Sequence, residues 1–111
     1  MNNIIKTFPN PCSQRNYTIV FSLPHFLTSC PNKTSPELAH LEVSYIPDQL
    51  CIEADSLREY WSSFKDQGIF YETTINQIFD DIMYICKPRW LKLNGSFDTE
   101  GDIKATIVIE S

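Results

Sequence analysis

INQIFDDIMYICKP, residues 75–88, is the stretch that decides the fold of this chain. Its apolar side chains recur three and four residues apart, which is the spacing of one face of an α-helix. Lys87-Pro88 ends the pattern, because proline cannot continue a helix and restricts the residue before it. The stretch therefore predicts an amphipathic helix whose apolar face consists of Ile75, Ile78, Phe79, Ile82 and Cys86.

A second amphipathic pattern precedes this helix. Ser56 and Glu59 have the spacing of a capping box, in which the two side chains bond free amides of the first turn. The sequence therefore predicts that a helix begins at Ser56, and that Gly68 ends it. The apolar face of this helix consists of Leu57, Tyr60, Trp61 and Phe64.

Alternating apolar and polar residues, typical of half-buried strands, flank the two helices. Residues 17–23 and 40–45 alternate before the helices, and residues 91–97 and 103–109 alternate after them. Pro24 is expected to end the first of these strands. The order strand, strand, helix, helix, strand, strand predicts an α+β domain, with a four-stranded antiparallel sheet covered on one face by two helices.

Length and composition indicate one compact domain. The chain has 111 residues, of which 42% are hydrophobic. We expect residues 16–111 to form this domain and residues 1–15, which contain Pro9 and Pro11, to form an irregular arm. A domain this small buries less of its surface than a larger one, so homo-oligomerisation is expected.

Charge and hydropathy exclude several classes of partner. The net charge of -5 argues against direct binding of nucleic acid, which relies on clustered Lys and Arg. No segment has the length and hydropathy of a membrane span, and residues 1–9 lack the layout of a secretion signal. We therefore expect a cytoplasmic protein that contacts no membrane.

The cysteines show neither a zinc-finger nor a thioredoxin-like spacing. His25 and His40 do not form a zinc pattern with Cys30, so no metal is expected. In the absence of a secretion signal, we expect reduced thiols. The four cysteines are Cys12, Cys30, Cys51 and Cys86.

Six short motifs carry a resemblance to a known family. They are RNYTI at 15–19, FLTSCP at 26–31, YIPD at 45–48, CIE at 51–53, GIFYE at 68–72 and PRW at 88–90. In their order and spacing, the chain resembles the short, single-domain 7-cyano-7-deazaguanine reductases over residues 9–109. The resemblance implies a tunnelling fold with the order ββααββ. It also implies a homo-oligomer with active sites at its subunit interfaces.

The activity implied by the resemblance is NADPH-dependent reduction of the nitrile of 7-cyano-7-deazaguanine to an aminomethyl group, a step of queuosine biosynthesis and thus of tRNA modification. Cys30 matches the nucleophile, since a thiolate can attack a nitrile carbon to form a thioimide. Glu37 matches the position of the family's general acid, where an aspartate is usual. By residue type alone, Cys30 is also compatible with a buried structural thiol.

The resemblance also assigns binding residues. Glu72 and Tyr71 match positions that orient the deazapurine, and Glu53 is a weaker candidate for the same role. By residue type alone, Glu72 is equally suited to the positive end of a helix dipole. Tyr71 stands where the family usually has a histidine.

Ser56 and Arg58 match the family's nicotinamide-cofactor motif and are expected to bind NADPH. Asp55 stands where the family usually has a lysine, which reverses a charge beside the expected phosphates. Two alternatives therefore remain: an amidine-forming or non-reducing deazaguanine-binding homologue, and a non-enzymatic interaction module. The aromatic surface of such a module would consist of Tyr60, Trp61, Phe64 and Trp90.

Overall fold

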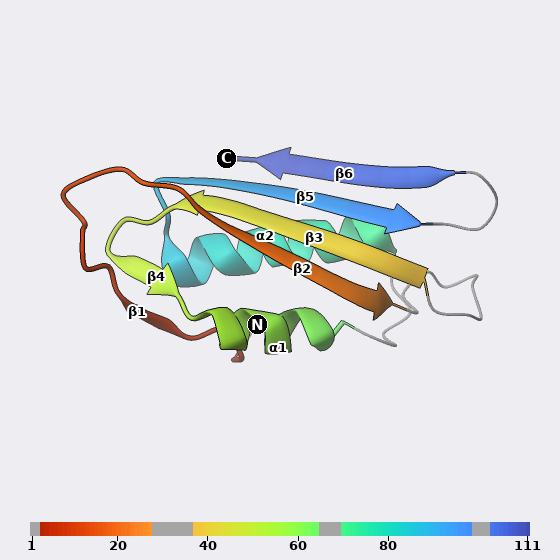
Figure 1. Ribbon diagram of the computed structural model, residues 1–111, viewed down its shortest axis with the longest axis horizontal. Helices are drawn as coiled ribbons and strands as arrows, with labels where there is room; N and C mark the ends of the chain where they lie inside the picture. The colour runs from red at the N-terminus through yellow and green to blue at the C-terminus, as the bar shows by residue number, and fades with distance from the viewer. Residues whose placement is uncertain (1–2, 28–36, 65–69, 99–102) are drawn as a thin grey trace.

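The computed structural model describes residues 3–27, 37–64, 70–98 and 103–111, with residues 25–27 and 37 described by their backbone. Four antiparallel strands form the larger sheet, in the order β2-β3-β5-β6, and two short strands form a second sheet. Helices α1 and α2 lie along one face of the larger sheet, and the small sheet lies at one end of it (Figure 1). The expected α+β class is confirmed. The elements are β1 (Thr7–Pro9), β2 (Ile19–Leu27), β3 (Glu37–Ile46), β4 (Leu50–Ile52), α1 (Ala54–Ser62), α2 (Tyr71–Cys86), β5 (Trp90–Asp98) and β6 (Lys104–Glu110).

The core lies between the larger sheet and the helices. Val43 of β3 pairs with Phe21 of β2 on one side and with Leu93 of β5 on the other. Because side chains alternate across a strand, these residues share one face of the sheet. The fully buried residues of β3 and β5 on this face are Leu41, Val43, Tyr45, Leu91, Leu93 and Phe97.

Helix α2 follows the sequence prediction closely. Ile75, Ile78 and Ile82 are fully buried against the sheet, as their spacing predicts. Lys87 has φ 48°, the left-handed conformation common just after a helix, and its backbone N–H donates to the Met83 carbonyl oxygen. The helix therefore ends at the predicted place.

The predicted start of α1 is wrong. The helix begins at Ala54, and Glu53 rather than Ser56 occupies the N-cap position, with no side-chain cap. The Ser56 hydroxyl instead donates to the Glu53 carbonyl oxygen and accepts the Lys6 backbone N–H, each at 2.8 Å. The capping-box spacing is thus present, but the Ser56 hydroxyl is hydrogen-bonded to Lys6, which lies 50 positions away. Gly68, the expected end, lies outside the described residues.

Strand β2 also continues beyond its predicted end. Pro24 pairs with His40 inside the strand, which ends at Leu27. β2 lies at the edge of the sheet, where a residue without a backbone N–H can leave the outer side unpaired. His40 lies on the polar face, within 2.7 Å of the Ser22 hydroxyl, as expected for an alternating strand.

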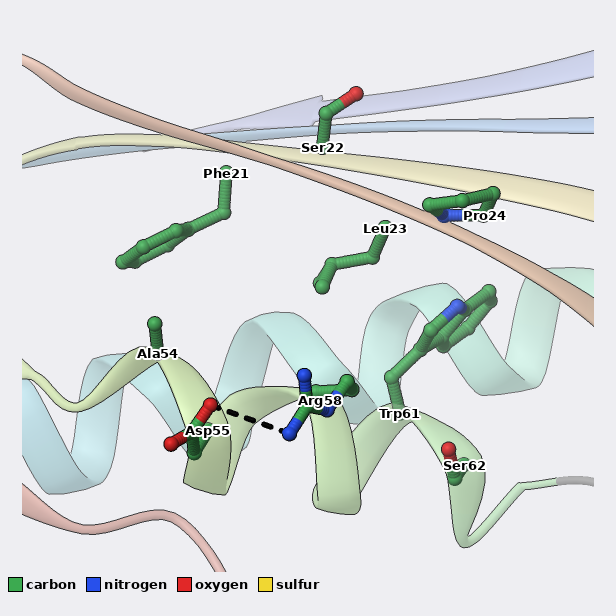
Figure 2. A pocket seen from close by; sticks show the side chains of 9 residues that line it. All are labelled: Phe21, Ser22, Leu23, Pro24, Ala54, Asp55, Arg58, Trp61 and Ser62. Carbon is green, nitrogen blue, oxygen red and sulfur yellow. Dashed lines mark ion pairs between the residues drawn. The ribbon is translucent and has the colours of Figure 1, made fainter.

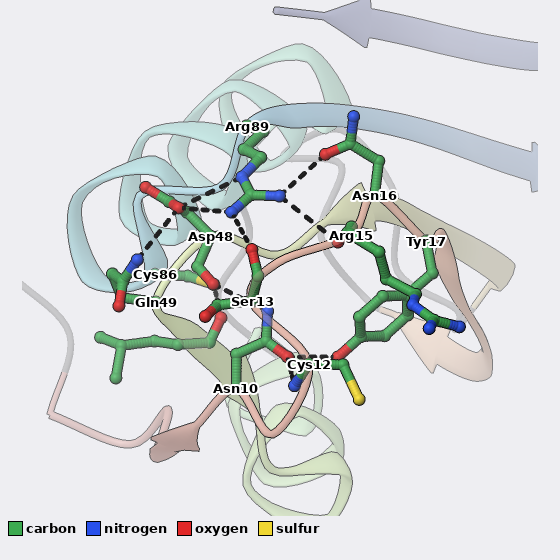
Figure 3. Close-up of polar contacts among 11 residues, drawn as sticks. Asn10, Cys12, Ser13, Arg15, Asn16, Tyr17, Asp48, Gln49, Cys86 and Arg89 are labelled. Atoms are coloured by element: carbon green, nitrogen blue, oxygen red, sulfur yellow. Dashed lines mark hydrogen bonds and ion pairs between the residues drawn. The ribbon is translucent and has the colours of Figure 1, made fainter.

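The N-terminal segment, expected to be irregular, contains β1, which pairs antiparallel with β4. The side chain of Arg89 holds the following residues in place (Figure 3). Its guanidinium donates to the carbonyl oxygen of Ser13 at 2.6 Å and to the side-chain oxygen of Asn16 at 2.8 Å. It also forms an ion pair with Asp48 at 3.0 Å. The segment from 7 to 16 is therefore attached to the larger sheet at the end where β3 finishes and β5 begins.

Gly95 allows α2 to lie close to β5. A Cβ atom at this position would come within 2.7 Å of the Ile75 Cδ1 atom and 3.1 Å of the Phe97 ring. Over-packing of this kind costs about 1–3 kcal/mol, which outweighs the gain of about 0.4–1 kcal/mol from a less flexible unfolded chain. We therefore expect Gly95→Ala to lower the free energy of unfolding by about 1–2 kcal/mol, measured by urea denaturation.

Ile75→Val supplies the matched test, because valine lacks the Cδ1 atom. Added to Gly95→Ala, it should recover part of the lost stability, whereas alone it should cost about 0.5–1.5 kcal/mol. Purely additive effects of the two substitutions would show that the close contact between helix and strand is not the cause.

Candidate active site

Strand ends and the first turn of α2 meet at one end of the larger sheet. β2 ends at Leu27 and β3 begins at Glu37, and these two residues are paired in register. Cys30, the predicted nucleophile, lies between them in sequence and outside the described residues. Two residues after Glu37, Ala39 pairs with Phe97 near the end of β5. The backbone of the predicted general acid therefore belongs to the same end of the sheet as Phe97.

Tyr71 brings α2 to this end of the sheet. It is the first residue of the helix, and its ring stacks on Phe97 with centroids 4.1 Å apart and planes 10° apart. Only 8% of Tyr71 is exposed, and its hydroxyl has no hydrogen-bond partner among the residues that the structure describes. A buried hydroxyl without a partner costs stability in the single chain.

Glu72 follows in the first turn of α2 and is exposed. Its carboxylate therefore lies next to free backbone amides, at the positive end of the helix dipole. The Phe70 carbonyl oxygen accepts from the backbone and the hydroxyl of Thr74, which fixes the first turn. The structure thus brings Tyr71 and Glu72 together, and the backbone of Glu37 lies at the same end of the sheet.

Three cysteines lie among the described residues, and two of them are buried. Cys51 is 2% exposed and Cys86 is 1% exposed, and the Cys86 thiol donates to the Leu50 carbonyl oxygen. Burial, together with the nearby Cys51, raises the pKa of Cys86 to about 11, so this thiol stays protonated at neutral pH. Cys12 is partly exposed. Cys51 and Cys86 are therefore structural rather than nucleophilic thiols.

A groove runs along α1, where the sequence places the cofactor residues. Its cavity of about 600 Å³ is lined by Lys6 and Ile4 of the N-terminal segment and by a row of α1 residues. Volumes of this size are common for ligand sites. The remaining lining residues are Glu53, Asp55, Ser56, Arg58, Glu59 and Ser62.

Arg58 also borders a second cavity, of about 420 Å³, between β2 and α1 (Figure 2). Its guanidinium lies 3.2 Å from Asp55, and both side chains are well exposed, at 71% and 80%. An ion pair this exposed is weak and salt-sensitive, so Arg58 can exchange Asp55 for a phosphate at little cost. Lys6, Arg58 and the start of α1 therefore offer contacts to a phosphate, while Glu53, Asp55 and Glu59 line the same groove and oppose it.

Ser56 contributes to this groove indirectly. Its hydroxyl is only slightly exposed and is engaged with backbone groups of Lys6 and Glu53. It therefore holds Lys6 against the start of α1. Sequence reasoning missed Lys6, which lies in a segment without periodicity and has no motif around it.

A family profile described as "QueF-like protein" matches residues 36–111. Curated proteins named NADPH-dependent 7-cyano-7-deazaguanine reductase match over nearly the whole chain. The relative from Nitrosococcus oceani is 42% identical over 98% of this chain and 84% of its own length. This chain belongs to the QueF-like family.

Two further reductases match this chain to a similar extent. The reductase from Magnetococcus marinus is 40% identical over 96% of this chain and 84% of its own length. A relative of the same name from Nitrosospira multiformis is 41% identical over 96% of this chain and 76% of its own length. The family predicted from the short motifs is therefore confirmed.

A solved structure supports the fold of this QueF-like chain. The apo form of the archaeosine synthase QueF-Like superposes with a TM-score of 0.77, over 85% of this chain and 92% of that one. Its sequence identity of 16% shows a shared fold alone. Within the described ranges, no helix has the length and hydropathy needed to cross a membrane, and no cluster of side chains could hold a metal ion.

One predicted binding residue lies apart from the others. Glu53 precedes α1, whereas Tyr71 and Glu72 begin α2, and the two helices run in opposite directions so that their first turns lie towards opposite ends of the sheet (Figure 1). Glu53 instead lines the groove with Arg58. A single chain of this QueF-like protein therefore does not bring Glu53 to the first turn of α2.

Proposed function

We propose that this protein is an NADPH-dependent 7-cyano-7-deazaguanine reductase that converts the nitrile to an aminomethyl group, as one step of queuosine biosynthesis. The observation that carries the proposal is the 42% identity to a reductase of that name over 98% of the chain. The buried, unpartnered Tyr71 hydroxyl at the predicted substrate position supports it.

In this proposal, Cys30 is the nucleophile. Its thiolate attacks the nitrile carbon, a C–S bond forms, and one C–N π bond breaks to place an electron pair on nitrogen. Glu37 donates the proton that this nitrogen takes up, which gives a neutral thioimide. Glu37 is paired with Leu27 at one end of the sheet, and Cys30 lies between these two residues in sequence.

Tyr71 and Glu72 orient the deazapurine. A carboxylate offers two acceptor oxygens to the amino and ring N–H groups of the base, and the adjacent tyrosine hydroxyl can donate or accept. Stacking on Phe97 fixes the Tyr71 ring, so little rotamer freedom is lost when the hydroxyl bonds the substrate.

Arg58 holds cofactor phosphates, and Ser56 keeps the wall of the groove in place. NADPH would supply two equivalents of hydride to the nitrile carbon, and the C–S bond to Cys30 would break between the two transfers, which returns the thiolate and leaves the amine. Asp55 competes for Arg58, so the groove binds the cofactor only when a phosphate displaces this carboxylate.

The assembly we propose is a homo-oligomer of single tunnelling-fold domains, residues 16–111, each with an N-terminal arm over residues 1–15. Glu53 and the first turn of α2 lie towards opposite ends of one chain. A site that uses both would take them from two neighbouring subunits. A stable monomer in light scattering would contradict this arrangement.

The test of the function mixes purified protein with 7-cyano-7-deazaguanine and measures the intact mass and the absorbance of NADPH. We expect a mass increase equal to the nitrile compound, and oxidation of NADPH that depends on the nitrile. An adduct without oxidation would favour an amidine-forming or non-reducing homologue. The absence of both would exclude a catalytic role for this site.

Tyr71→Phe gives a prediction that separates binding from stability. Removing a buried hydroxyl that has no partner should raise the free energy of unfolding by about 1 kcal/mol, measured by urea denaturation. The same change should weaken substrate binding about 3- to 10-fold, since one neutral hydrogen bond is lost. A loss of stability with unchanged affinity would show that the hydroxyl serves the fold instead.

A further inference from the structure

Lys6 is a fixed part of the groove wall. Its backbone N–H donates to the Ser56 hydroxyl at 2.8 Å, and its carbonyl oxygen accepts the Glu53 N–H at 2.9 Å. Strand β1 begins at the next residue, where Thr7 pairs with Ile52, and Ile5 on the other side is buried. The backbone of Lys6 is therefore held against the first turn of α1 from both directions.

The side chain of Lys6 is exposed and weakly engaged. Its ammonium lies 3.5 Å from the Asn3 carbonyl oxygen, a neutral acceptor at the outer limit of a hydrogen bond. Arg58, in contrast, faces Asp55 at 3.2 Å. Of these two groove-lining cations, Lys6 thus retains the more available charge.

The groove carries an excess of negative charge, which Lys6 partly offsets. Glu53, Asp55 and Glu59 line the same cavity, and three carboxylates beside one arginine would repel a phosphate. Lys6 halves this excess of negative charge and gives a phosphate a second cation to pair with, and it comes from the N-terminal segment rather than from α1. The ammonium of lysine is a strongly hydrated point charge on a flexible stem, which suits contact with an anion that arrives from solvent.

We propose that Lys6 is a cofactor-binding residue that contacts a phosphate of the nicotinamide dinucleotide together with Arg58, in place of the cation that Asp55 does not provide. This inference rests on the proposed function. Lys6 acts here on affinity and not on the bonds that are made or broken.

The experiment measures binding of NADP⁺ and NAD⁺ to the full chain by isothermal titration calorimetry at low and high salt. Lys6→Gln should weaken binding of NADP⁺ about 5- to 10-fold at low salt, and less at high salt because salt screens exposed charges. Lys104→Gln is the matched control, since it removes the same charge from a lysine paired with Asp98 on β5. An equal loss for NAD⁺ assigns the contact to the pyrophosphate, and a loss for NADP⁺ alone assigns it to the 2′-phosphate.

A second variant tests the compensation directly. If Lys6 replaces a missing cation, Asp55→Lys in the Lys6→Gln background should restore the affinity. Equal NADP⁺ affinity of Lys6→Gln and the unaltered protein would overturn the inference. So would the absence of NADP⁺ binding in a protein that still forms the nitrile adduct. Loss of the adduct itself from the unaltered protein would instead contradict the proposed function.

Discussion

Cys30→Ala is expected to gain no mass from 7-cyano-7-deazaguanine and to lose reductase activity by a factor of about 1,000 or more. Alanine offers no nucleophile, and the other residues of the site can bind the base but cannot form the C–S bond. Intact-mass spectrometry measures the adduct, and nitrile-dependent loss of NADPH absorbance measures the activity. This effect is the largest that the proposed mechanism predicts.

Cys12→Ala is the matched control, because Cys12 is partly exposed whereas Cys51 and Cys86 are buried. We expect it to retain the adduct and the activity. Peptide mapping should find the modification on the fragment that contains Cys30. An adduct that persists in Cys30→Ala, or that maps to another cysteine, would disprove the assignment of the nucleophile.

Glu72→Gln should weaken substrate binding by about 10- to 100-fold. The amide keeps one acceptor oxygen but presents an NH₂ group to the N–H donors of the base, and a hydrogen bond to a charged group contributes about 1.5–3 kcal/mol. Titration of the nitrile into Cys30→Ala protein, with and without the second substitution, isolates binding from chemistry.

Asp80→Asn provides the control for Glu72→Gln. Asp80 is an exposed acid on the same helix, further from its first turn, so its replacement removes one charge without touching the site. Glu72→Gln should also cost about 0.3–1 kcal/mol of stability through the helix dipole. If that small loss were the whole effect and affinity did not change, Glu72 would serve the helix alone.

The elements that the sequence predicted well are those with one long buried face. Helix α2 has an apolar row of 3.6-residue period, and β5 alternates with period two, because each contacts the core along its whole length. The errors lie where a distant contact overrides a local signal. Ser56 has the capping-box spacing but bonds to Lys6, and β1 is only three residues long and needs β4 as its partner.

The roles assigned to the site residues stay predictions. Tyr71 and Glu72 were identified by their motif, and they form the start of α2. Lys6 was not, because a lysine in a segment without periodicity gives no local sign of what it will face. The pairing of β1 with β4, together with the bonds of the Lys6 backbone to Ser56 and Glu53, brings it to α1.

The Arg89 contacts can form only late in the synthesis of the chain. Arg89 bonds residues 73 and 76 positions earlier, at Asn16 and Ser13. At a translation rate of about 5–20 residues per second, it is added roughly 4 to 15 seconds after them. In that interval the N-terminal segment lacks the bonds to Arg89, and the side chain of Ile5, which is buried in the folded protein, is without its final surroundings.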